Sequence, residues 1–277
     1  MKTGLITFLI FLLGPGMVLG QVQSIGNFGS VNWGNAAGPV ITAKGIGAMN
    51  PNLPQAPQRP AAIRAAKLDA LRNALETVKG VNISSNTTVR NFMVENDEIR
   101  TRVEGFVNNF KFEEKPHYMS DGTVEISVEL PLSGIMMDAL LPTSIAAAPA
   151  AMTWPGEPVQ FAAKQAFTGL VVDARGLGIL PAMAPRILDE ENNEIYGSAY
   201  VSREFALKHG VVGYAKSVEQ AQKIDRLGNS PGVIKAVKSG GENKTDIVIS
   251  KGDADSIKSS SKDMKYLSEC RVVFVVD

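Results

Sequence analysis

The stretch PAAIRAAKLDALRNALETVKG, residues 60–80, decides the fold of the N-terminal half of the chain. Apolar side chains recur in it three and four residues apart, which places them along one side of an α-helix. The residues of this stripe are Leu68, Leu71, Leu75 and Val78. Pro60 suits the first helical position and Gly80 suits the end of a helix. We therefore expect a helix over residues 60–80 that buries the leucine stripe against a sheet.

Strand patterns lie on both sides of this helix. Residues 40–46 and 81–89 are rich in β-branched side chains, and residues 124–130 alternate apolar with polar side chains, as in a strand with one buried face. A second amphipathic helix is expected over residues 99–110. The alternation of strands and helices predicts an α+β domain over residues 40–134, with one sheet packed on two helices.

The C-terminal half, residues 159–277, has a different pattern. Its strands are continuously apolar, as in a sheet covered on both faces, and helical segments separate them. We expect an α/β domain here. The expected strands lie within residues 168–178 and at 211–215, 246–250 and 271–277, and the expected helices lie at 218–227 and 253–267.

The first twenty residues have the features of a cleavable signal peptide. Lys2 provides a positive start, and the apolar stretch 5–13 is too short to span a bilayer. Val18 and Gly20 are suitable residues ahead of a cleavage point. We expect cleavage after Gly20 and a mature protein that is periplasmic or secreted.

Two further segments lack strong periodicity. Residues 21–39 are rich in Gly and Asn, which predicts a flexible lead-in, and residues 135–158 are rich in Ala, Pro and Met, which predicts a linker. Residues 136–141 could instead form a short helix that docks on a neighbouring element. With a linker between them, the two halves are expected to fold as separate units.

The composition excludes several classes of partner. Lys and Arg number 28 and Asp and Glu also number 28, so no basic surplus favours nucleic acid or anionic lipid. No second long apolar run follows the signal, so no transmembrane segment is expected after its removal. The single cysteine, Cys270, excludes an internal disulfide.

The N-terminal half resembles a known family. A strand ending near residues 43–47, the Ala-rich helix 61–75, residues 78–81 and the closing strand 121–128 follow one another. That succession, over residues 40–132, resembles the Lpp-twenty lipoprotein family and the N-terminal domain of the flagellar assembly T protein. The resemblance implies a non-enzymatic envelope protein, lipid-anchored in some members and part of the ring around the flagellar basal body in others. No anchor is expected here, because the chain has no lipobox cysteine.

Candidate chemical groups are few. Only His117 and His209 are present, which excludes a three-histidine zinc site. We expect His117 in an exposed loop and His209 at a helix C-terminus, where an imidazole meets free carbonyl groups. A Cys270–His209 dyad is the alternative, and a buried thiol in an apolar strand argues against it. We expect no catalytic, cofactor or metal site.

The one candidate ligand site consists of Asp173 and Arg175. Both follow a buried strand, at the edge where α/β sheets bind ligands. A structural ion pair between them is the competing interpretation, and residues 189–191 are expected in a solvated turn. Asp253 and Asp255 are expected to serve the N-terminus of a helix.

These features together predict a non-enzymatic, exported component of the cell envelope that acts by binding. The expected partners are other envelope proteins or the cell wall, with a flagellar or outer-membrane association and a homo-oligomer left open. The alternative is a periplasmic ligand binder or enzyme that uses Asp173 and Arg175.

Overall fold

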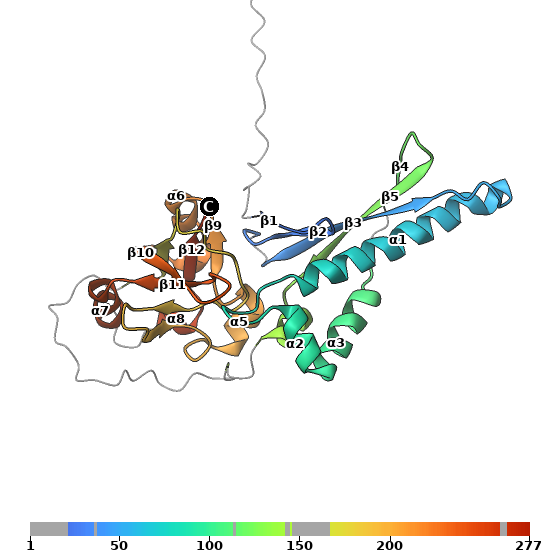
Figure 1. The fold of residues 1–277 in the computed structure, drawn as a ribbon. Helices are drawn as coiled ribbons and strands as arrows, with labels where there is room; N and C mark the ends of the chain where they lie inside the picture. Colours follow the sequence, from blue (N-terminus) through green and yellow to red (C-terminus); the bar gives the residue numbers. More distant parts are fainter. Residues whose placement is uncertain (1–21, 36–37, 113–114, 142–144, 146–166, 261–264) are drawn as a thin grey trace, which may run out of the picture.

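The chain forms two lobes that lie side by side (Figure 1). The structure is a computed structural model and describes residues 22–35, 38–112, 115–141, 145, 167–260 and 265–277. The N-terminal lobe contains a five-stranded sheet with helices, and the C-terminal lobe, which begins at residue 167, contains a seven-stranded sheet. The predicted α+β half followed by an α/β half is confirmed.

The N-terminal sheet has the strand order β1-β2-β3-β5-β4 and is antiparallel throughout. Its strands are β1 (Val22–Ile25), β2 (Gly29–Asn32), β3 (Val40–Ala48), β4 (His117–Tyr118) and β5 (Thr123–Pro131). In β5 the predicted alternation of buried and exposed side chains is confirmed. The flexible lead-in expected at residues 21–39 is wrong for the segment that forms β1 and β2, because these strands pair with each other and extend the sheet.

Helix α1 (Gln55–Lys79) runs along β3 and β5 (Figure 1). It begins five residues before Pro60. The expected leucine stripe is only partly correct: Leu71 and Val78 are buried, whereas Leu68 is 64% exposed. A stripe of alanines lies fully buried against the sheet instead. These residues are Ala62, Ala66, Ala70 and Ala74.

Two glycines of β3 explain why alanines occupy this face. A Cβ atom added to Gly45 would lie 2.0 Å from the backbone nitrogen of Ala70, and one added to Gly47 would lie 2.0 Å from the carbonyl oxygen of Ala62. The backbones of α1 and β3 are therefore in direct contact. At this separation only the smallest side chains fit between helix and strand.

Two shorter helices complete the helical layer of the lobe, α2 (Val89–Glu95) and α3 (Asp97–Asn108). Thr88 caps α2 by accepting a hydrogen bond from the amide of Asn91, and Asn96 caps α3. The strand expected at residues 81–89 is not formed. This segment makes only isolated bridges, one of them to the other lobe, and so it contributes to the contact between lobes rather than to the sheet.

The C-terminal sheet has the order β8-β7-β11-β10-β6-β12-β9. Strand β6 is parallel to β10 and β12, and β12 is parallel to β9. The strands are β6 (Leu170–Asp173), β7 (Ile187–Leu188), β8 (Glu194–Tyr196), β9 (Gly213–Ala215), β10 (Gly232–Gly240), β11 (Asp246–Ile249) and β12 (Val272–Val275). The helices are α5 (Arg203–His209), α6 (Val218–Gln222), the 3₁₀ turn η1 (Asp225–Leu227), α7 (Lys251–Ser259) and α8 (Lys265–Ser268).

Both long helices expected in this lobe are interrupted. Residues 218–227 form α6 and η1, and residues 253–267 fall on α7 and α8, with residues 261–264 outside the described part. The expected coverage of both sheet faces is observed for β6 and β12. Val171 and Val273 pack with Ala221 of α6 and Leu227 of η1, whereas their neighbours in sequence face the other side of the sheet.

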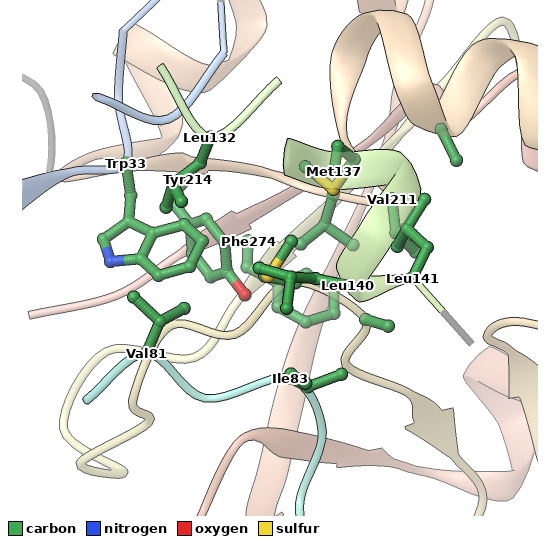
Figure 2. Close-up of a cluster of buried hydrophobic side chains, with 14 of the residues drawn as sticks. Trp33, Val81, Ile83, Leu132, Met137, Leu140, Leu141, Val211, Tyr214 and Phe274 are labelled. Carbon is green, nitrogen blue, oxygen red and sulfur yellow. The ribbon is translucent and has the colours of Figure 1, made fainter. Parts of the chain in front are cut away.

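That other side of the sheet packs on the N-terminal lobe, so the two lobes share one hydrophobic core. Figure 2 shows Trp33, Val81, Ile83 and Leu132 of the first lobe close to Tyr214 and Phe274 of the second. The rings of Trp33 and Tyr214 meet edge to face with centroids 5.5 Å apart. This continuous core is at odds with the expectation that the halves fold as separate units.

Helix α4 (Ile135–Leu140) lies inside the segment expected to be a linker. Met137 and Leu140 project from it into the shared core (Figure 2). Asp138 accepts hydrogen bonds from Arg203 at 2.7 Å and from Arg102 at 3.2 Å. Residues 136–141 therefore belong to a short helix that docks on a neighbouring element, the alternative to a linker that the sequence left open. The rest of the linker lies outside the described residues, apart from Ile145, which is buried.

Candidate functional site

The expected candidate pair Asp173 and Arg175 lies at the C-terminal end of β6. The two side chains form a two-pronged ion pair, with Arg175 Nε 2.8 Å from Asp173 Oδ1 and Nη2 2.7 Å from Oδ2. The hydrogen bond from Arg175 lowers the pKa of Asp173. Because each group satisfies the other, this geometry matches the structural ion pair rather than an open ligand site.

The other polar residues singled out in the sequence have local structural roles. Asp189 is buried and accepts hydrogen bonds from the backbone of Glu191 and Asn193, which forms the expected turn. Ser250 caps α7, and its hydroxyl donates to the carboxylate of Asp253. The prediction that Asp253 interacts at the N-terminus of this helix is confirmed.

His117, His209 and Cys270 do not form a catalytic set. His117 is exposed as expected but lies in strand β4 rather than in a loop, and His209 is the last residue of α5, as expected. Cys270 is buried, and its electrostatic neighbours are Arg226 and Tyr196. Burial raises the pKa of the Cys270 thiol to about 11, so the thiolate is scarce at neutral pH.

A larger hollow lies where the two lobes meet at the edge of the C-terminal sheet. We name it the seam groove; it has a volume of about 1030 Å³. Residues 32–35 and 38–39 of the first lobe form one side, and α6 and η1 form the other. Strand β9 lies between them and is the last strand of its sheet. The groove therefore exists only when both lobes are in place.

Strand β9 presents part of its backbone to the seam groove. The amide of Val276 donates to the carbonyl oxygen of Ala215, so the backbone groups of Ala215 face β12. Because successive residues of a strand direct their hydrogen-bonding groups to opposite sides, those of Tyr214 face the open edge. An open strand edge can pair with another extended chain.

Arg226 of η1 is the central cation of the seam groove. Its Nη1 atom donates to the carbonyl oxygen of His209 at 3.1 Å, and its Nη2 atom donates to those of Gly210 and Cys270. Its Nε atom is fully buried and has no hydrogen-bond partner among the described residues. Burial lowers the pKa of Arg226, because the charged form loses hydration. No described carboxylate forms an ion pair with Arg226.

Gly213 of β9 makes room for this guanidinium. A Cβ atom added there would lie 3.1 Å from Arg226 Nη1. The remaining charges of the groove are uneven. Glu269 is paired with Arg271 at 2.8 Å and with Lys265 at 3.5 Å, whereas exposed Lys223 forms no ion pair with a described residue. Burial also lowers the pKa of His209, which keeps its ring neutral near pH 7.

Reasoning from sequence missed the seam groove entirely. Its residues come from loops, helix ends and one edge strand, none of which has a periodic pattern. Arg226 gave no signal either, because it lies in an amphipathic segment that also carries Lys223 and Asp225.

The described residues contain no cluster of three or more His, Cys, Asp or Glu side chains able to hold a metal ion. None of the helices in the described part of the chain has both the length and the apolar character needed to cross a membrane.

Fold and groove together define a two-lobed α/β protein with a groove at the seam between its lobes. Residues 169–277 match the family model described as "Treponema pallidum Tp0624, second domain". The match covers the C-terminal lobe, including β9, η1 and Arg226, and none of the N-terminal lobe. No curated protein shows significant similarity to the chain.

Proposed function

We propose that this chain is a non-enzymatic, exported component of the cell envelope that binds a polypeptide partner in the seam groove. The single observation that carries the binding role is the groove itself, which both lobes build around an edge strand. The amino-terminal pattern with Lys2 and the apolar stretch 5–13, which lies outside the described residues, supports export.

The chemistry of the groove supports binding over catalysis. Two of its three cations are held in fixed contacts within the described residues: Arg226 is bound to three carbonyl groups, and Arg271 is bound to Glu269. Half-buried Phe205 supplies aromatic surface in the groove, whereas Trp33 beside β9 is buried in the shared core. Aromatic surface, a strand edge and a few charges are the usual elements of a peptide-binding groove. The alternative site at Asp173 and Arg175 is not favoured, because these groups satisfy each other.

Site-specific photo-crosslinking tests the binding role. A photo-reactive amino acid replaces Lys223 or Asp225, which are exposed in the groove, and Lys238 on β10 serves as the control position outside it. We expect the same polypeptide adduct from both groove positions and none from Lys238. Equal adducts at all three positions, or none, would refute the groove as the binding surface.

The export role has a separate test in the same cells. The intact mass of the purified chain should correspond to a protein that begins at Gln21. Retention of residues 1–20, or the added mass of a lipid, would contradict the proposal.

A further inference from the structure

We infer that the partner segment in the seam groove is an extended polypeptide that carries an acidic side chain, which Arg226 and Lys223 receive. This inference rests on the proposed function and specifies the chemistry of its partner. The charge of the groove favours an acidic side chain, and the strand edge that lines it favours an extended polypeptide.

No described carboxylate balances the charge of Arg226. Three backbone carbonyls accept its hydrogen bonds, but carbonyl groups carry only partial charges and leave the unit positive charge uncompensated. Arg226 is half-buried, and a guanidinium that is largely shielded from water normally has a carboxylate beside it. Here the described residues supply none, and the Nε–H group has no acceptor. A carboxylate on the partner would supply the missing charge.

The other charged groups of the groove do not remove this excess of positive charge. Among the described residues, three cations line it, Lys223, Arg226 and Arg271, against two carboxylates, Asp225 and Glu269. Glu269 is already shared between Arg271 and Lys265, so Arg226 and Lys223 stand against Asp225 alone and leave one positive charge in excess. An anionic partner would be attracted to this surface, and an acidic side chain would be held there.

The strand edge argues for a polypeptide rather than a small anion. The backbone groups of Tyr214 face the groove, and an extended chain can bond to them by adding a strand beside β9. The volume of about 1030 Å³ is at the upper end of the range for small-molecule sites, about 300–1,000 Å³. The elongated partner thus uses the edge for backbone bonds and the cations for its acidic side chain.

A paired peptide array tests the inference. Each pair consists of two heptapeptides built from Val, Thr, Ser and Ala that differ only at the central position, Glu in one and Gln in the other. The labelled full chain is the probe, and anisotropy measurements follow on the strongest pairs. We expect the Glu member to bind about tenfold more tightly, because a hydrogen bond to a charged group is worth about that factor.

Variants of matched charge link the preference to the groove. The Lys223→Glu variant should lose the preference for Glu, whereas Lys238→Glu, the same change on β10 outside the groove, should keep it. The Arg226→Lys variant, used only if its circular dichroism spectrum matches the wild type, should weaken binding of the Glu peptide and leave the Gln peptide unchanged.

The alternative outcomes separate the inference from the proposed function. Equal binding of Glu and Gln peptides, with crosslinks still confined to Lys223 and Asp225, would overturn the acidic preference and leave the binding role in place. Binding of inorganic phosphate but of no peptide would overturn the polypeptide partner. Absence of any peptide binding, of phosphate binding and of crosslinks would refute both.

Discussion

The contact between α1 and β3 permits a prediction whose sign and size follow from the structure. In Gly47→Ala, the new Cβ atom would lie 2.0 Å from the carbonyl oxygen of Ala62 and 2.6 Å from the amide nitrogen of Ala66. Ordinary contacts of a Cβ atom begin at 3.4 Å. Both neighbours are backbone atoms of a helix, so no side-chain rotation relieves the overlap, and α1 must move away by about 1.4 Å.

The cost of that movement has two parts. Overpacking a tight interface costs about 1–3 kcal/mol. A displacement of α1 by about 1.4 Å would also remove a large share of the dispersion energy between the alanine stripe and the sheet. Alanine gains back about 0.5–1 kcal/mol of backbone entropy relative to glycine. We therefore expect the free energy of unfolding to fall by about 2–4 kcal/mol, measured by urea denaturation with circular dichroism.

The matched control is Gly105→Ala in α3. No atom lies within 4 Å of a Cβ added to Gly105, so the same chemical change in a helix should raise stability by about 0.5–1 kcal/mol. If Gly47→Ala unfolds at the same urea concentration as the wild type while Gly105→Ala behaves as expected, the backbone contact between α1 and β3 is wrong.

Three further predictions concern other parts of the molecule. Leu71→Ala should destabilise the chain by about 2–5 kcal/mol and Leu68→Ala by about 0.5 kcal/mol or less in urea melts, because only Leu71 is buried; equal effects would contradict the orientation of α1. Hydrogen bonds from Arg203 lower the pKa of Asp138 below its ordinary value of 3.8. The ionised carboxylate therefore stabilises the fold above pH 3.8, and this stabilisation is lost as the pH falls through the lowered pKa. The urea midpoints of wild type and Asp138→Asn should converge at low pH, and a difference that stays constant with pH would refute this. The Cys270 thiol, with its pKa raised by burial to about 11, should not react with a thiol reagent at pH 8 until urea unfolds the chain.

Sequence periodicity predicted the elements that are amphipathic on their own. The alternation over residues 124–130 predicted the location and the buried face of β5. The position of α1 also followed, but not its contact face. A pattern of apolar residues gives more weight to leucine than to alanine and therefore places the leucines against the sheet. In the structure the helix lies so close to Gly45 and Gly47 that the alanines form the contact instead.

The elements that the sequence did not indicate depend on tertiary contacts. Residues 81–84 were expected in a sheet and instead bond to the second lobe, where the amide of Met183 donates to the carbonyl oxygen of Asn82 and that of Ala184 to Ile83. Strand β10 was not predicted, because exposed lysines interrupt the apolar pattern of its sequence. The seam groove could not be predicted, because its two sides are brought together only by the packing of one lobe on the other.

The placement of β12, the last strand of the chain, between β6 and β9 has a consequence for how the chain reaches its native state. Strand β6 pairs on one side with residues 232–235 and on the other with residues 272–275, roughly one hundred residues further along. Such distant pairing makes folding slow, because the loop between the partners must close before any contact forms. Until residues 272–275 arrive, the shared core lacks Phe274, and the apolar side chains of α4 near it in Figure 2 are uncovered on that side. A nascent chain therefore passes through a period in which its first lobe is vulnerable to aggregation, and a chaperone that shields this surface would raise the yield of folded protein.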